Sequence, residues 1–270
     1  MTDRRINAAA AEGFERGADD YERARPSYPA AAVARIVREG SIGPGSRVLD
    51  LAAGTGKLTR LLVPTGAELI AVEPVDAMRR RLVSIAPDVE VLDGTAEAIP
   101  VTDHTIDVVT VAQAFHWFDA PRALTEIARV LRPGGLLALI WNVRDETVGW
   151  VRAFTELTVE RSGGRPYTRF HVASSAGEAM TRDHVEVIGA SGRFGPVEEE
   201  RYASPQDATI DLVVDRAAST SFVSALPTVE RDALLADLRT MLEQHPDLAG
   251  RDSFVFPHDA WLSWCRTPVA

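Results

Sequence analysis

The chain has 270 residues, 46% of them hydrophobic, and its formal net charge at pH 7 is −10. This length and apolar content suffice for one α/β domain with a full core and a smaller cap. The negative charge argues against nucleic acid as a partner, because such binding depends on cations that neutralise phosphates. We therefore expect a small-molecule ligand.

The sequence also indicates the cellular compartment in which the protein is expected. Its single cysteine, Cys265, excludes an intrachain disulfide and is expected to be a buried structural thiol, which fits a reducing cytosol. There is no apolar run of about 18 residues and no secretory leader, since the alanines at 8–11 form a short run with polar flanks. We predict a cytoplasmic protein with no membrane contact, and either a monomer or a homodimer fits the sequence.

The most informative segment is residues 48–56 (VLDLAAGTG), a short apolar strand that runs into a glycine-containing turn. Gly54 and Gly56 lack side chains, so the backbone there can approach a bound molecule closely and adopt a positive φ. A helix that begins just after the turn directs free N–H groups toward the ligand, which suits a carboxylate or a phosphate. The segment predicts a site for an anionic or zwitterionic cofactor.

Spacing separates the cofactors that use such a loop. A phosphate-binding P-loop needs glycine where this chain has Leu51, and serine or threonine where it has Leu58. A dinucleotide-binding loop needs a third glycine where this chain has Thr59. The first interpretation fails and the second is weak, while a tight turn without any ligand stays open on this segment alone.

Two further strands end in residues that suit a nucleoside. The apolar run 69–72 ends in Glu73-Pro74, about 20 residues past the loop, where an acid can accept hydrogen bonds from both ribose hydroxyls. The run 89–92 leads into a turn at 93–100 (DGTAEAIP). Both sets of polar residues are expected at the same edge of a parallel sheet.

The fourth strand, 106–111, leads into 112–119 (AQAFHWFD). His116 is expected at the edge where open α/β sheets bind ligands, and an imidazole there can act as a base or as a hydrogen-bond donor. A histidine that only orients the loop is an equal alternative. Asp119 is a predicted helix N-cap, and the continuous apolar run 136–141 predicts a fifth strand covered on both faces.

These motifs resemble those of the class I S-adenosylmethionine-dependent methyltransferases, with the type 11 methyltransferase domain as the nearest description. The first motif of that family is an acidic residue followed by spaced glycines, as in residues 50–56, although Ala52 stands where the first glycine is usual. Residues 114–118 (AFHWF) resemble the subgroup of the trans-aconitate and cantharidin methyltransferases. The resemblance covers 47–146 and implies an α/β fold: a seven-stranded, mostly parallel Rossmann-like sheet with helices on both faces and a helical cap.

The resemblance implies S-adenosyl-L-methionine as the cofactor and assigns roles to individual residues. Many relatives have aspartate where this chain has Thr95, so recognition of adenine passes to the Thr95 hydroxyl, to backbone groups or to Asp93. The predicted catalytic residues are His116 and Trp117. The predicted cofactor-binding residues are Tyr21, Arg25, Asp50, Ala52, Gly54, Gly56, Glu73, Pro74, Met78, Gly94, Thr95, Ala96 and Gln113. No metal is expected, because the six histidines lack paired ligand spacing.

We divide the chain into an N-terminal helical segment that covers the site (1–46), a cofactor-binding core (47–148) and a C-terminal part (149–270). Residues 6–25 predict an amphipathic helix, which ends before Pro26. Arg25 at its end is expected beside the cofactor carboxylate, although a solvated N-terminal helix is an equal alternative.

The C-terminal part combines strands and helices. Residues 194–202 and 260–266 predict an antiparallel strand pair at the edge of the sheet, with cap helices at about 205–248 between them. Further helices are expected at 149–161 and around 175–182.

The expected reaction is methyl transfer to a small-molecule acceptor, most simply O-methylation of a carboxylate or a hydroxyl. Methylation of nitrogen or carbon, or a non-catalytic protein that binds S-adenosylmethionine, are the alternatives. Several arginines near the cap are expected at the surface, but one or two that face inward would select an acidic acceptor. They are Arg144, Arg152, Arg161, Arg165, Arg169 and Arg182.

Overall fold

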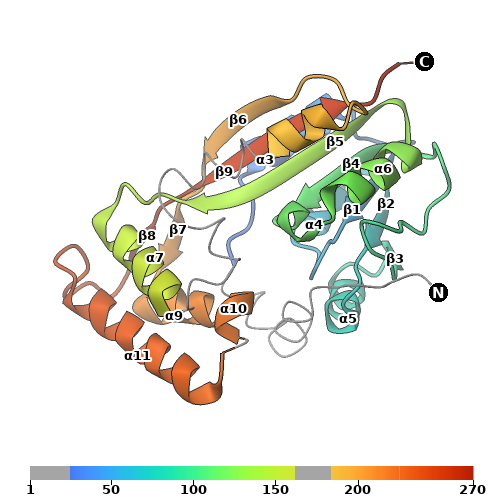
Figure 1. Cartoon of the computed structure of the whole chain (residues 1–270). Helices are drawn as coiled ribbons and strands as arrows, with labels where there is room; N and C mark the ends of the chain where they lie inside the picture. Colours follow the sequence, from blue (N-terminus) through green and yellow to red (C-terminus); the bar gives the residue numbers. More distant parts are fainter. Residues whose placement is uncertain (1–24, 162–183, 225, 270) are drawn as a thin grey trace.

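The computed structural model describes residues 25–161, 184–224 and 226–269. A seven-stranded sheet in the order β3-β2-β1-β4-β5-β9-β6 forms its centre (Figure 1). Strands β1 to β5 are parallel, whereas β9 is antiparallel to both β5 and β6. The strands are β1 Arg47–Leu51, β2 Glu68–Val72, β3 Glu90–Leu92, β4 Ile106–Ala112, β5 Leu131–Arg144, β6 Glu198–Ala203 and β9 His258–Arg266. The predicted α/β fold with a mostly parallel sheet of seven strands is confirmed.

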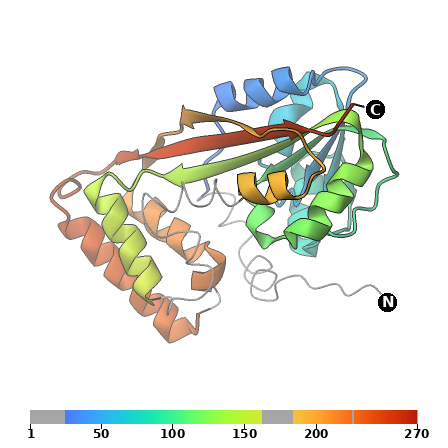
Figure 2. The ribbon, with the colours of Figure 1, turned by 45° about the horizontal axis from the view of Figure 1, so that its top comes forward.

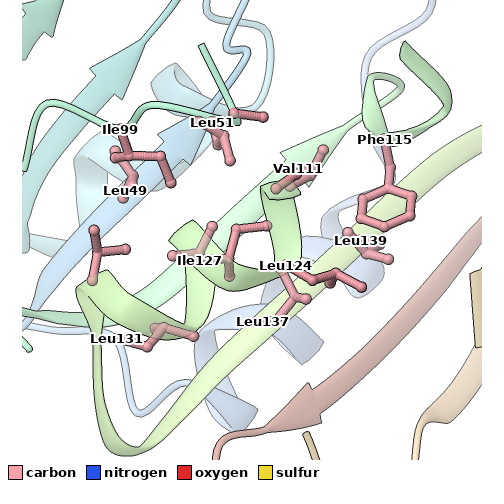
Figure 3. Packing of buried hydrophobic residues seen from close by; sticks show 14 of the residues in the cluster. Leu49, Leu51, Ile99, Val111, Phe115, Leu124, Ile127, Leu131, Leu137 and Leu139 are labelled. Carbon is pink, nitrogen blue, oxygen red and sulfur yellow. The ribbon is translucent and has the colours of Figure 1, made fainter. Parts of the chain in front are cut away.

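Helices cover both faces of this sheet because alternate residues of each strand point to opposite sides. Leu137 and Leu139 of β5 belong to the apolar cluster of one face, whereas Ala138 belongs to the cluster of the other. Figure 3 shows Leu124 and Ile127 packed against Leu137 and Leu139 on the first face. The covering helices are α6 Ala120–Val130 on that face and α3 Ala30–Glu39, α4 Thr59–Leu62 and α5 Asp76–Ile85 on the other.

Local sequence explains where α6 begins. The carboxylate of Asp119 accepts a hydrogen bond from the Arg122 backbone N–H at 3.5 Å, and Pro121 occupies the first turn. Both are residues that helix N-termini favour, since the first N–H groups of a helix have no intrahelical partner. The helix then buries a stripe of apolar residues that includes Leu124 and Ile127.

The cap has an apolar cluster of its own, in which Trp150, Phe154, Leu238 and Phe256 are buried. It consists of α7 Gly149–Arg161, α9 Ile210–Ala218, α10 Ser221–Ser224, α11 Thr228–Gln244 and a small sheet of β7 Gln206–Ala208 with β8 Phe254–Phe256. The sequence did not predict this two-stranded sheet. In Figures 1 and 2 the cap lies beyond the ends of β5 and β9, on one side of the core.

Strands β5 and β9 connect the core to the cap. Their register runs without interruption from Leu136↔Arg266 to Arg144↔His258, and Figure 2 shows both strands extending from the core toward the cap helices. Cys265, in β9, is buried. Within the part of the chain that the structure describes, no helix has the length and apolar character needed to span a membrane.

Candidate active site

The glycine loop follows β1 and contains three residues with left-handed backbone. The φ angles are 54° at Ala52, 58° at Gly54 and 83° at Gly56. The helix predicted after the loop is present but short, because α4 gives way after Leu62 to a 3-10 turn, Val63–Thr65. The loop therefore owes its shape chiefly to its own glycines.

Ala52 adopts a backbone conformation that costs an L-residue about 1–2 kcal/mol. Glycine removes this cost. It also gives the unfolded chain more conformational freedom, which lowers stability by about 0.4–1 kcal/mol. We expect Ala52→Gly to raise the free energy of unfolding by about 0.5–1 kcal/mol in urea denaturation. The control is Ala53→Gly, at a position without a positive φ, which should lower stability. Equal losses in the two variants would show that Ala52 is not strained.

Gly54 and Gly56 have different surroundings. A Cβ added to Gly54 would meet no atom within 4 Å, so the loop is open to a ligand at this position. A Cβ added to Gly56 would lie 2.9 Å from Cγ of Leu82, inside the packing between the loop and α5. The predicted close approach of a ligand therefore fits Gly54, whereas Gly56 is required by protein packing.

Glu73 is buried at the end of β2, with 5% of its surface exposed. Its carboxylate accepts hydrogen bonds from the backbone N–H of Gly54 at 2.9 Å and of Val75 at 2.8 Å. Burial raises the pKa of Glu73 to about 7, against the lowering effect of these two hydrogen bonds. The carboxylate thus ties the glycine loop to the neighbouring strand at the place predicted for the ribose.

Asp50 lies inside the sheet rather than on the loop surface. Its carboxylate accepts hydrogen bonds from the hydroxyls of Thr59 at 2.5 Å and Thr110 at 2.9 Å. The register of β1 and β4 pairs Asp50 with Thr110 directly. Burial raises the pKa of Asp50 to about 6. These contacts make Asp50 a link between β1, β4 and α4.

The turn after β3 packs against the end of β2. A Cβ on Gly94 would lie 2.5 Å from Cδ of Pro100, so only glycine fits there. Thr95 is half-buried and pairs through its backbone with Ala98, while Ala96 is buried. Arg79 of α5 joins the two strand ends, since it donates to the Glu73 backbone carbonyl at 2.8 Å and to Asp93 at 3.2 Å.

Three more predicted residues border these elements. Pro74 is half-buried after Glu73, and Met78 is buried in the first turn of α5. Gln113 has a φ of 59°, and its side chain donates to the Asn142 carbonyl at 3.3 Å. The structure thus brings the residues predicted to bind the cofactor, from Asp50 to Gln113, to the ends of β1 to β4 and the turns that follow them.

His116 and Trp117 lie in a 3-10 turn, Phe115–Trp117, directly after β4, and their ring centres are 4.9 Å apart. His184 packs against this turn. Its ring stacks on Trp141 at 4.3 Å and meets Phe115 edge-on at 5.9 Å. The sequence did not single out His184, because the stretch before it lacks clear periodicity.

The electrostatics of this edge keep His116 neutral. Burial, and to a smaller extent the charges of Arg25 and His184, lower the pKa of His116 to about 3. Burial also lowers the pKa of His184 to about 4. Both imidazoles are therefore uncharged near pH 7, and Arg25 lies close enough to His116 to influence its protonation.

Asn142, at the end of β5, fixes the turn that carries Arg25. Its side-chain amide donates to the carbonyls of Ser27 at 3.1 Å and Pro26 at 3.5 Å. Its amide oxygen accepts from the hydroxyl of Ser204, which precedes β7, at 3.4 Å. Asn142 was not predicted from the sequence, although a polar residue near the end of a parallel strand is a usable signal. Tyr21 and the helices predicted at 6–25 and around 175–182 lie outside the described residues.

Among the described residues, no group of three or more histidine, cysteine or carboxylate side chains could hold a metal ion. The residues that do converge fit a nucleoside cofactor instead. The loop leaves space above Gly54, and a buried carboxylate, Glu73, stands at the adjacent strand end. This is the arrangement that ribose hydroxyls require.

Comparison with known proteins agrees with this geometry. A model of the methyltransferase domain matches residues 49–139, which contain the glycine loop, Glu73 and His116. An uncharacterized methyltransferase of Mycobacterium tuberculosis is 41% identical over 238 residues, which is 88% of each chain. The malonyl-[acyl-carrier protein] O-methyltransferase of Methylococcus capsulatus is 43% identical over 102 residues, 35% of this chain and 37% of the relative.

Solved structures share the fold. The YcgJ protein of Bacillus subtilis superposes with a TM-score of 0.57 at 20% identity and covers 90% of this chain and 100% of its own. The chain belongs to the class I S-adenosylmethionine-dependent methyltransferases. It is an enzyme of that class, and S-adenosylmethionine is its cofactor.

Proposed function

We propose that the protein methylates an oxygen atom of a small-molecule acceptor, with a carboxylate as the preferred group and a hydroxyl as the second choice. The observation that carries this proposal is the burial of His116, which lowers the pKa of its imidazole to about 3. Such an imidazole is a weak base at neutral pH. A carboxylate is already ionised above a pKa of about 4 and needs no base, whereas a phenol has a pKa near 10.

One relative and one sequence resemblance support oxygen as the target. A relative that matches part of the motif core is named as an O-methyltransferase. Residues 114–118 resemble the subgroup of the trans-aconitate and cantharidin methyltransferases, and membership of that subgroup is part of this proposal. We also propose that the protein forms a homodimer. Light scattering of the purified protein tests this oligomeric state.

The site residues have distinct roles in this proposal. Bound S-adenosylmethionine supplies a methyl group on a sulfonium, which carries its own leaving group. Gly54 and Glu73 hold the ribose, Thr95 and Ala96 border the adenine, and the remaining predicted cofactor-binding residues shape the loop around them. His116 and Trp117 orient the acceptor oxygen for in-line attack in a pocket that excludes water.

Chemical lability of the product tests the proposal. The purified enzyme is incubated with S-adenosylmethionine labelled in its methyl group and with a panel of carboxylic acids, phenols and amines. A methyl ester releases volatile labelled methanol in base, whereas methyl ethers, methylamines and C-methyl products do not. Label that is stable in base would contradict carboxylate methylation, and no transfer to any member of the panel would contradict the proposed acceptor class.

We expect Gln in place of His116 to lower turnover about tenfold with a carboxylate acceptor, because only positioning is lost. Turnover of the wild type should stay flat from about pH 6 to about pH 9, since His116 titrates far below this range. Initial rates at saturating S-adenosylmethionine and acceptor across this range measure both effects, so that the pH dependence of cofactor binding does not enter. A wild-type rate that rises with a pKa near 6.5, and a rise that disappears in His116→Gln, would instead indicate a general base and a hydroxyl acceptor.

A further inference from the structure

His184 and Trp141 form a ring stack at the reaction edge of the sheet. Their ring centres are 4.3 Å apart and their planes differ by 17°. Trp141 belongs to β5 and follows the residue that pairs with the last residue of β4. His184 belongs to the helical residues 184–190, which pack on the face of the sheet that α6 covers (Figure 2). The stack therefore lies beside the turn that follows β4.

The stack contains two buried nitrogen atoms without hydrogen-bond partners. Only 5% of His184 and 1% of Trp141 are exposed. Among the described residues, neither Nε2 of His184 nor Nε1 of Trp141 makes a hydrogen bond. A buried polar atom without a partner costs about 1–3 kcal/mol, so such atoms are uncommon and often mark a functional site. Two of them in one ring stack indicate a place where a polar group binds.

The two nitrogen atoms suit an oxygen ligand. An indole N–H can only donate, so Trp141 requires an acceptor. Burial lowers the pKa of His184 to about 4, so its ring is neutral at pH 7 and has one N–H, which Nε2 can hold. A carboxylate or carbonyl oxygen can accept from both rings, whereas an ammonium group can accept from neither. The stack therefore favours a ligand that presents oxygen atoms.

The stack also contacts the turn that carries the predicted catalytic residues. Phe115, the first residue of this turn, meets the His184 ring edge-on at 5.9 Å. His184 is close enough to His116 to contribute to the lowering of its pKa. A ligand that binds the stack is thus held next to His116.

We propose that His184 and Trp141 bind the methyl acceptor through its oxygen atoms. With a carboxylate acceptor, one oxygen attacks the methyl group and the other accepts hydrogen bonds from the two rings. Both nitrogen atoms are closed to solvent in the free protein, so the turn Phe115–Trp117 moves when the acceptor binds. This inference rests on the proposed function and adds two acceptor-binding residues to it.

Nuclear magnetic resonance of the indole N–H groups tests the contact without turnover. Protein labelled with nitrogen-15 and saturated with S-adenosylhomocysteine is titrated with acetate, butyrate and benzoate at constant ionic strength. Benzylamine serves as a cation that cannot accept a hydrogen bond. The Trp141 signal, identified by its absence in Trp141→Phe, should move with the carboxylates and stay in place with benzylamine. The Trp117 signal, identified in the same way, should also move with the carboxylates because the turn moves.

Trp264 provides a matched control. Its buried Nε1 also lacks a partner among the described residues, but its ring belongs to the apolar cluster of the opposite face of the sheet. Its indole signal should therefore stay in place throughout the titration. Movement of the Trp264 signal equal to that of Trp141 would show a general effect of the added salt and would overturn the contact.

Substitutions test the hydrogen bonds themselves. His184→Phe keeps an aromatic ring but removes Nε2, and it should weaken carboxylate binding at least tenfold in calorimetry. Its stability in urea should not fall, because an unpaired buried nitrogen is removed. Trp141→Phe should weaken carboxylate binding by a similar factor, and Trp264→Phe should leave it unchanged. S-adenosylhomocysteine should bind all three variants as it binds the wild type. If one variant fails to fold, the other and the wild-type spectra still decide the result.

The outcomes separate this inference from the proposed function. A Trp141 signal that does not move with any of the three carboxylates, or equal carboxylate affinity in the wild type, His184→Phe and Trp141→Phe, overturns the contact. Binding that depends on both rings, without methyl transfer to any acid in the panel, supports the contact and removes the proposed function. Methyl transfer to an acid with the same KM in the wild type and both variants does the reverse.

Discussion

Valine in place of Gly54 should weaken the binding of S-adenosylhomocysteine more than a hundredfold while the protein remains folded. The loop is open where the new side chain would extend, so the branched group enters the space of the cofactor rather than the protein core. The positive φ adds strain, about 1–2 kcal/mol for an L-residue and more for a β-branched one. Calorimetry gives the affinity, and circular dichroism during heating reports the fold.

Alanine at Gly54 and at Gly56 provides a matched pair of controls. Both substitutions place a methyl group on a left-handed backbone, so the strain is similar. Only the methyl at position 56 meets the protein, because Leu82 lies within 2.9 Å. We expect Gly56→Ala to lose about 1–3 kcal/mol more stability than Gly54→Ala. Equal stability of the two variants would contradict the packing role of Gly56.

Alanine in place of Glu73 should weaken the binding of S-adenosylhomocysteine at least a hundredfold. Two hydrogen bonds from ribose hydroxyls to a charged acceptor are lost, each of which contributes about 1.5–3 kcal/mol. The Gly54 and Val75 N–H groups also lose their acceptor, which loosens the loop. Affinity within about threefold of the wild type would exclude Glu73 from the ribose site.

The raised pKa of Glu73, about 7, gives this binding a pH dependence. Ribose hydroxyls that donate to the carboxylate favour its ionised form, so binding is accompanied by proton release below pH 7. Affinity should therefore be about tenfold weaker at pH 6 than at pH 8 in the wild type and independent of pH in Glu73→Gln. A wild-type affinity that does not change over this range would contradict the assignment.

The same shift affects the stability of the free protein. A carboxyl group whose folded-state pKa is raised contributes stability that is complete below its unfolded pKa and is lost as the pH rises through the folded value. Glu73, with a pKa of about 7, and Asp50, with a pKa of about 6, both act in this direction. The cofactor-free protein therefore loses part of its stability between about pH 4.5 and pH 7, and the cofactor restores it by binding the ionised form of Glu73.

The core was predictable because its determinants are local. Apolar runs mark β1 to β5, Asp119 marks the start of α6, and a left-handed turn can be read from Gly54 and Gly56. The separate tasks of these two glycines were not predictable, because they depend on Leu82, which lies on a helix that begins 20 residues later in the chain.

The cap and the charged residues around it were harder to predict from the sequence. Arg144 is half-buried and packs against Phe154, whereas the sequence favoured a surface position. The sequence does not distinguish Arg216 or His258 from other residues, since a single arginine on a helix or a single histidine at a strand end carries no spacing signal. The packing of these two residues depends on a tertiary contact between α9, β8 and the start of β9. Sequence periodicity shows which face of an element is buried but not which distant element covers it.

Because β5 pairs with β9 without interruption, the cap is connected to the core by the sheet itself rather than by a flexible linker. Rotation of the cap relative to the glycine loop would break the backbone pairing between residues 142–144 of β5 and residues 258–260 of β9. Ligands are therefore expected to enter through movements of individual helices and turns. A cap transplanted from a relative must preserve this register, because a shift of one residue would turn Arg144 to the opposite face and away from Phe154.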